Sequence, residues 1–102
     1  MPTIYEYFGI ILKFFSKEHL PPHVHAFYSN NYGMRVEFFN KGNKIDKITI
    51  KQLKGYKKFP PAQMRDLKKL VNRYQYEIVN DFITFAIKNQ RVTKKVIRRK
   101  IK

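Results

Sequence analysis

Three histidines, His19, His23 and His25, fall within seven consecutive residues, and Glu18 precedes the first of them. Side chains alternate between the two faces of a β-strand, so His23 and His25 on one strand point to the same face. His19 can return to them across Pro21-Pro22. Such a cluster suits proton transfer or phosphate contact near neutral pH, or metal binding. It equally suits a structural role, in which the imidazoles hydrogen-bond the loop backbone and fix the turn.

The candidate catalytic residues are therefore His19, His23 and His25, with ribonuclease as the candidate activity, and whether the protein is an enzyme stays open. His23 directly follows Pro22, so we expect it to lock the turn and His25 to face a pocket or ligand. We expect no metal and no cofactor, because three histidines with one adjacent carboxylate make an incomplete ligand set. With no cysteine in the chain, disulfides and thiolate chemistry are excluded.

The second chemical feature is charge. Twenty-two Lys and Arg against seven Asp and Glu give a net charge of +15. This imbalance indicates a polyanionic partner, and we expect nucleic acid, RNA in preference to DNA. A solvated lysine-rich surface would explain many of the lysines but not the scarcity of acids. The candidate nucleic-acid-binding residues are Arg35, Arg65, Lys68, Lys69, Arg73, Lys94, Lys95, Arg98 and Arg99.

Aromatic residues lie among these charges and could stack on unpaired bases. They are Tyr56, Phe59, Tyr74 and Tyr76. For Tyr74 a second interpretation is available, because it fits the apolar stripe of a predicted helix.

The elements that must position these residues begin with strands. Residues 4–15 are rich in aromatic and branched side chains and predict one strand, in which Gly9 indicates a bulge or a close backbone approach. Residues 23–28, 34–39 and 44–50 predict three more, separated by turn residues at 30–33 and 40–43. Short links of this kind indicate an antiparallel meander.

After Pro60-Pro61 the apolar period changes to that of a helix, with Met64, Leu67, Leu70 and Val71 on one stripe. The pattern continues to about residue 86, as one long helix or as two with a break near Gln75. We therefore predict an α+β fold: an antiparallel meander of about four strands followed by C-terminal helices that cover one face.

The predicted domain organisation is a single α+β domain over residues 1–88 and a basic C-terminal arm over 89–102. This last segment interleaves apolar residues with cations. A flexible arm, a last sheet strand and a helix formed on a partner all stay open. No stretch is apolar enough to span a membrane, and residues 1–4 do not resemble a signal peptide, so a cytoplasmic protein without membrane contact is expected.

Part of the chain resembles a known family. Residues 19–26 read His-Leu-Pro-Pro-His-Val-His-Ala and follow an apolar segment, and residues 77–82 read Glu-Ile-Val-Asn-Asp-Phe. Both resemble signatures of the bacterial family named domain of unknown function, number 4160, with Phe82 where that family usually has Trp. The resemblance covers about residues 2–88. It implies a toxin-like component of a two-gene toxin–antitoxin module, and it supplies no catalytic residues.

We therefore expect a toxin-like protein that acts on RNA or on the translation machinery, with an acidic antitoxin-like protein as its partner. In this interpretation the histidines handle protons and Arg35 or nearby lysines steady phosphate charge. The alternative is a non-catalytic nucleic-acid-binding regulatory module, either an antitoxin or a transcriptional regulator. A third interpretation, a metal-binding domain, depends on the histidines alone.

Overall fold

A computed structural model describes residues 3–14, 21–88 and 90–102 of the chain. The elements follow the chain in the order β1 (Thr3–Tyr7), β2 (Ile10–Lys13), β3 (His23–Tyr28), β4 (Tyr32–Lys41), β5 (Lys44–Gln52), α1 (Pro61–Arg73), α2 (Gln75–Phe82), η1 (Ile83–Ile87) and β6 (Lys95–Ile97). The protein is therefore of the predicted α+β class.

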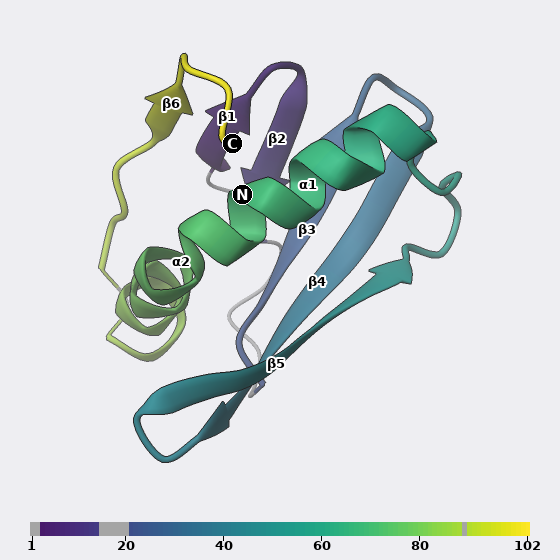
Figure 1. Cartoon of the computed structure of the whole chain (residues 1–102). Coiled ribbons are helices and arrows are strands. Elements are labelled where there is room, and N and C mark those ends of the chain that lie inside the picture. Colours follow the sequence, from purple (N-terminus) through teal and green to yellow (C-terminus); the bar gives the residue numbers. More distant parts are fainter. Residues whose placement is uncertain (1–2, 15–20, 89) are drawn as a thin grey trace.

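The strands form one mixed sheet in the order β5-β4-β3-β2-β1-β6 (Figure 1). Strands β1 to β5 are successive antiparallel neighbours, so the predicted meander is present. Strand β6 pairs parallel with β1, with Tyr5 opposite Lys95 and Tyr7 opposite Ile97. The chain thus returns to its first strand to complete the sheet.

The predicted count of about four strands is too low, because the sheet has six. One reason is that residues 4–15 do not form a single strand. They contain a hairpin whose two turn residues, Phe8 and Gly9, have φ angles of 43° and 87°. Two successive positive φ angles define a tight hairpin turn, which glycine enters without strain and phenylalanine rarely adopts. Gly9 therefore marks a reversal of the chain and not a bulge within one strand.

The other reason is β6, which lies in the C-terminal segment. Of the three conformations that the sequence leaves open for this segment, residues 95–97 adopt the last sheet strand. Two further contacts hold the segment beyond β6. The Ile101 N–H donates to the Tyr7 hydroxyl at 2.9 Å, and the Lys100 ammonium lies 2.9 Å from an Asp66 carboxylate oxygen.

The helical region consists of two helices. Pro60 is the N-cap of α1 and Pro61 is its first residue, a position where proline leaves no donor unsatisfied. Helix α1 ends at Arg73. Its C-cap is Tyr74, whose N–H donates to the Leu70 carbonyl and whose ring lies 5.4 Å from that of Tyr5. Helix α2 then begins at Gln75 in a new direction and continues into η1, a short π-helical segment.

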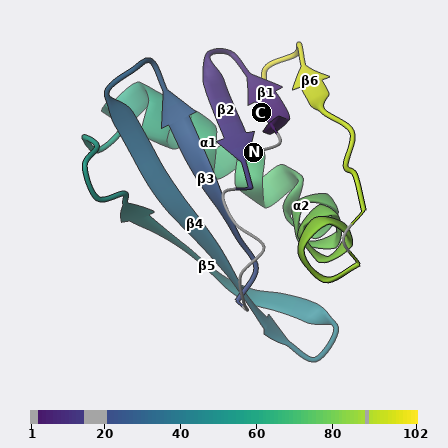
Figure 2. The same ribbon diagram turned by 180° about the vertical axis from the view of Figure 1, so that it is seen from behind.

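Helix α1 crosses one face of the sheet, with α2 near the end of the sheet beside β6 (Figure 1), and from behind β3 and β4 lie in front of α1 (Figure 2). The core lies between this face and the helices. Its members are buried side chains from four strands (β1 to β4), the residue that follows β2, both helices and the linker before α1. They include Ile4, Tyr5, Tyr7, Ile10, Leu12, Phe14, Val24, Ala26, Met34, Val36, Phe38, Phe59, Leu67, Leu70, Val71, Ile78 and Phe82. The alternate residues of β2 to β5 point to the opposite face.

Candidate functional site

The opposite face carries charged and imidazole side chains on four adjacent strands. We call it the polar face and define it by Lys13, His23, His25, Arg35, Glu37, Thr49 and Lys51. The register places these residues in two rows. One row runs Lys13–His25–Arg35–Lys51 and the other His23–Glu37–Thr49. Neighbours in a row are directly opposite on adjacent strands, where side chains interact most strongly.

The two histidines of β3 lie side by side, with ring centroids 5.9 Å apart, as expected for residues on one face of a strand. The Nδ1 of His23 donates to the Pro21 carbonyl oxygen at 3.2 Å, a contact between the first residue of β3 and the residue two positions before it. The His23 ring also contacts Phe82 of α2, 5.4 Å between centroids. Both histidines are buried, with 5% and 7% of their surface exposed.

Glu37 is the centre of the charge network. Its carboxylate lies 3.2 Å from Arg35 Nε and 3.1 Å from Lys51 Nζ, and it accepts a hydrogen bond from the Thr49 hydroxyl at 3.4 Å. Burial alone would raise the pKa of Glu37, but the hydrogen bonds and charges of Lys51 and Arg35 outweigh it and lower that pKa. Glu37 is therefore ionised at neutral pH and holds both cations on this face.

His25 has a strongly changed acidity. Burial, reinforced by the neighbouring His23 and the Arg35 cation, lowers its pKa from 6.5 to about 4. At neutral pH His25 is uncharged, so it can accept a proton but is not a proton donor from the imidazolium form. The burial of His25 is not apparent from the sequence, because polar residues at alternate positions of a strand give the same pattern whether that face of the strand is exposed or buried.

An aromatic pair continues the polar face beyond His25. The rings of Phe27 and Tyr56 lie 5.3 Å apart, edge to face, and the Lys13 ammonium lies 5.9 Å from the Phe27 centroid. A Cβ added to Gly33 would meet Tyr56 Cγ at 2.8 Å, so the Tyr56 ring rests on the bare backbone of β4. Of the predicted stacking residues, Tyr56 and Tyr76 are exposed, Tyr74 is partly buried, and Phe59 belongs to the core.

The predicted cations separate into two surfaces. Arg35 belongs to the polar face, whereas Arg65, Lys68, Lys69 and Arg73 lie exposed on α1, across the sheet from it. The C-terminal segment approaches α1. Together they form a hollow of about 390 Å³ that we call the α1 basic surface, lined by Lys68, Lys69, Asn72, Arg73, Ile101 and Lys102.

The remaining predicted cations differ in their surroundings. Lys94 pairs with Glu6 at 2.7 Å and Lys95 with Asp81 at 3.0 Å, so the structure uses both to attach the β6 region to the domain. Arg98 and Arg99 are exposed. The sequence pattern does not indicate Lys13, Glu37 and Thr49 of the polar face as site residues. The alternation of β4 and β5 indicates the last two once the register is known.

Metal binding has no support from the described part of the chain, where no group of three or more His, Cys, Asp or Glu residues is arranged to hold an ion. His19, a candidate catalytic residue, lies outside the described residues. Within the described ranges, no helix is long and apolar enough to cross a membrane.

These features define an α+β protein whose mixed sheet has one face covered by helices and one polar face built around a histidine pair. Residues 9–82 match the family model described as "Domain of unknown function (DUF4160)", and the chain belongs to that family. The match extends from the β1–β2 turn to the end of α2, and it includes the polar face and α1 but not β6. No curated protein and no solved structure matches the chain.

Proposed function

We propose that this protein binds RNA through the α1 basic surface and acts as the toxin-like component of a bacterial toxin–antitoxin module. One observation carries the RNA-binding part. Cations from two distant parts of the sequence, Lys68, Lys69 and Arg73 on α1 and Lys102 in the C-terminal segment, line one hollow. A concave surface with several cations can bind a phosphate backbone, because each phosphate that a cation neutralises releases counterions and this release favours binding.

The toxin part rests on the family resemblance and on the chemistry of the polar face. Because the polar face lies across the sheet from the α1 basic surface, cleavage at the histidines requires an RNA long enough to reach both faces. Cleavage of RNA by its own 2′-hydroxyl needs one group that accepts the hydroxyl proton and one that protonates the leaving 5′-oxygen. His25 suits the first role, because it is neutral at pH 7. His23, whose ring centroid lies 5.9 Å away, is the candidate for the second. Arg35 lies opposite His25 and provides positive charge for a phosphate.

A second function, non-catalytic nucleic-acid binding, is favoured by a specific observation. A pKa of about 4 makes His25 a weak base, and a buried imidazole that also neighbours a cation suits a structural role. In that case the polar face stabilises the sheet, and binding through the α1 basic surface is the whole activity.

The binding experiment measures the affinity for a short single-stranded RNA over a series of salt concentrations. The test variant is Lys69→Gln/Arg73→Gln/Lys102→Gln, and the control is Lys41→Gln/Lys54→Gln/Lys58→Gln, which removes the same charge from exposed positions elsewhere. At about 0.7 per phosphate contact, the test variant should reduce the slope of log affinity against log salt by about 2. Equal losses in both variants would mean that total charge matters and the surface does not.

The activity experiment separates the two functions. The protein, the test variant and His25→Gln are expressed inducibly in a bacterial host, while growth and total RNA are followed. If the protein is a ribonuclease, His25→Gln abolishes both growth inhibition and RNA loss while RNA binding is retained. If it is a non-catalytic binder, His25→Gln inhibits growth as the parent does and RNA stays intact. Absence of growth inhibition by the parent protein refutes the toxin assignment.

The proposed partner of such a toxin is an acidic protein. With a net charge of +15, the chain attracts carboxylates over a long range, which accelerates association at low salt. An acidic antitoxin-like protein is the partner we expect.

A further inference from the structure

Strand β5 forms one edge of the sheet, with β4 as its neighbour in the strand order. An edge strand presents unpaired N–H and C=O groups, which a second extended chain can bind as an additional strand. Both ends of β5 are engaged. The Ile45 N–H donates to the Tyr76 hydroxyl at 3.4 Å, and just beyond the strand the Leu53 N–H donates to the Gly33 carbonyl at 3.2 Å. Residues 47–51 form the middle of this edge.

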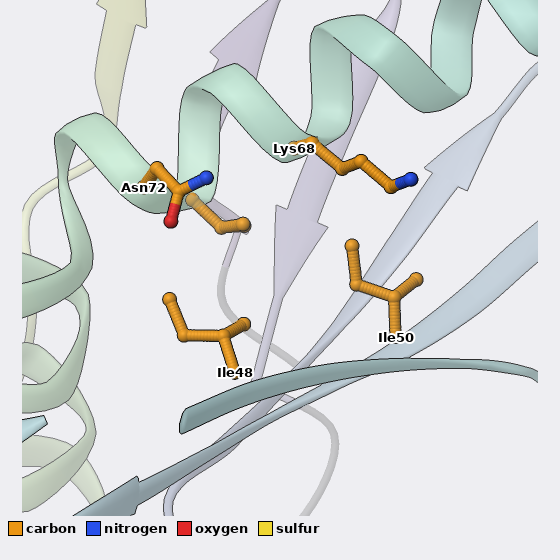
Figure 3. Close-up of a pocket in the computed structure, with 5 residues that line it drawn as sticks. Ile48, Ile50, Lys68 and Asn72 are labelled. Atoms are coloured by element: carbon orange, nitrogen blue, oxygen red, sulfur yellow. The ribbon is translucent and has the colours of Figure 1, made fainter. Parts of the chain in front are cut away.

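The inner side of β5 borders a hollow lined by both apolar and polar side chains. Ile48 and Ile50 point from β5 toward α1 and are only partly buried, and Lys68 and Asn72 of α1 lie above them (Figure 3). With Val71 these residues line a cavity of about 300 Å³, which we call the edge groove. Two branched apolar side chains at the border of a hollow provide a binding surface for further apolar side chains.

The outer side of the same five residues is basic. Lys47 and Lys51 alternate with Thr49 on the polar face, and both lysines are exposed. Lys51 also pairs with Glu37, so a carboxylate of a bound segment would share the Lys51 ammonium with Glu37. Lys68 of α1 provides a further cation at the edge groove. The middle of β5 therefore alternates apolar and basic side chains, Lys-Ile-Thr-Ile-Lys.

We propose that the β5 edge binds an extended acidic segment of a partner protein as an additional strand. The segment alternates apolar side chains, which enter the edge groove beside Ile48 and Ile50, with carboxylates, which face Lys47 and Lys51. This inference names the docking site of the acidic partner and rests on the proposed function for that partner's biological role. A second copy of this chain is a poorer occupant, because two β5 edges would bring lysines opposite lysines.

The probe is a labelled peptide of about eight residues in which glutamate and valine alternate, added to the full chain. Two further peptides carry backbone N-methyl groups, one on the odd residues and the other on the even ones. A strand donates its hydrogen bonds to a neighbour from alternate residues, so we expect one methylated peptide to bind like the parent and the other to fail. A peptide of the same composition with its glutamates in one block is the sequence control.

The protein variants are Lys47→Glu and Ile48→Ala, with Lys54→Glu as the matched control just beyond β5. Reversing the charge at Lys47 should weaken peptide binding about fivefold, since a cross-strand charge pair is lost and repulsion replaces it. Ile48→Ala should weaken it further, and Lys54→Glu should leave it unchanged. Amide hydrogen exchange should slow within residues 47–51 when the peptide is bound.

Several results would overturn the inference: no peptide binding, equal binding of both methylated peptides, or equal losses in Lys47→Glu and Lys54→Glu. RNA affinity is measured in the same variants. If Lys47→Glu weakens RNA binding and leaves peptide binding intact, the β5 lysines bind RNA and the inference is wrong. If the protein binds the peptide but binds no RNA, the docking site at the β5 edge is supported and the proposed RNA-binding function is refuted.

Discussion

Replacing His25 by glutamine should remove most of the pH dependence of stability between about pH 5 and pH 7. The pKa of His25 is about 4 in the folded protein against an ordinary value of 6.5. Between these values the unfolded chain binds a proton that the folded protein does not, so stability falls as the pH decreases. At about 1.4 kcal/mol per pKa unit, the full effect below pH 4 is about 3 kcal/mol, of which about 2 kcal/mol is lost between pH 7 and pH 5.

The measurement is urea unfolding followed by far-ultraviolet circular dichroism at several pH values, for the parent and His25→Gln. The chosen range avoids Glu37. Its pKa is lowered below 4.5, so its contribution to stability is present above that pH and is lost only as the pH falls further. A nuclear magnetic resonance titration of the His25 ring gives the folded-state pKa directly. If the ring titrates near 6.5, or if both proteins lose stability equally between pH 7 and pH 5, the reasoning is refuted.

Three further predictions concern the core and the chain reversals, each measured by urea unfolding. Phe82→Ala should cost about 3–5 kcal/mol, because Phe82 is 1% exposed and contacts Phe14 and His23, whereas Phe39→Ala, at an exposed position, should cost under about 1 kcal/mol. Removal of residues 95–102 should lower the free energy of unfolding by about 2–3 kcal/mol, since the partly buried Ile97 and Ile101 are lost. Removal of Lys102 alone should change it little. Equal stability of the two truncated proteins would contradict the packing of β6. Gly9→Ala should lower the free energy of unfolding by about 1 kcal/mol or more, and by more than Gly42→Ala does. Both glycines have a positive φ, but only a Cβ added at Gly9 meets a neighbour, Tyr28 at 3.2 Å.

The sequence predicts the local elements well because short-range patterns determine them. Strand β3 has the predicted bounds of residues 23–28, the two following strands extend the predicted ones by two residues or fewer at each end, and α1 begins at the predicted proline pair. The common face of His23 and His25 follows from strand alternation alone. The fold class is also predicted from short-range patterns, since a run of strands followed by helical periodicity indicates an α+β fold.

Features that depend on distant or unusual contacts were not predictable. The turn at Phe8-Gly9 requires a positive φ at phenylalanine, which residue statistics disfavour. The parallel pairing of β6 with β1 leaves no local pattern, because its partner lies at the other end of the described chain. The charge network around Glu37 depends on the register of β4 with β5, which a one-residue change in the loop between them would alter.

The pairing of β6 with β1 has a consequence for the order of folding. Tyr5 and Lys95 are ninety positions apart, whereas Tyr5 and its other partner, Leu12, are seven apart. By loop-closure entropy alone the distant pairing costs about 2 kcal/mol more. The hairpins of β1 to β5 should therefore assemble first, and β6 should join last and detach first. Each brief detachment separates Ile101 and Lys102 from α1 and returns them, so the hollow between the chain end and α1 would open and close while the five-stranded meander stays intact.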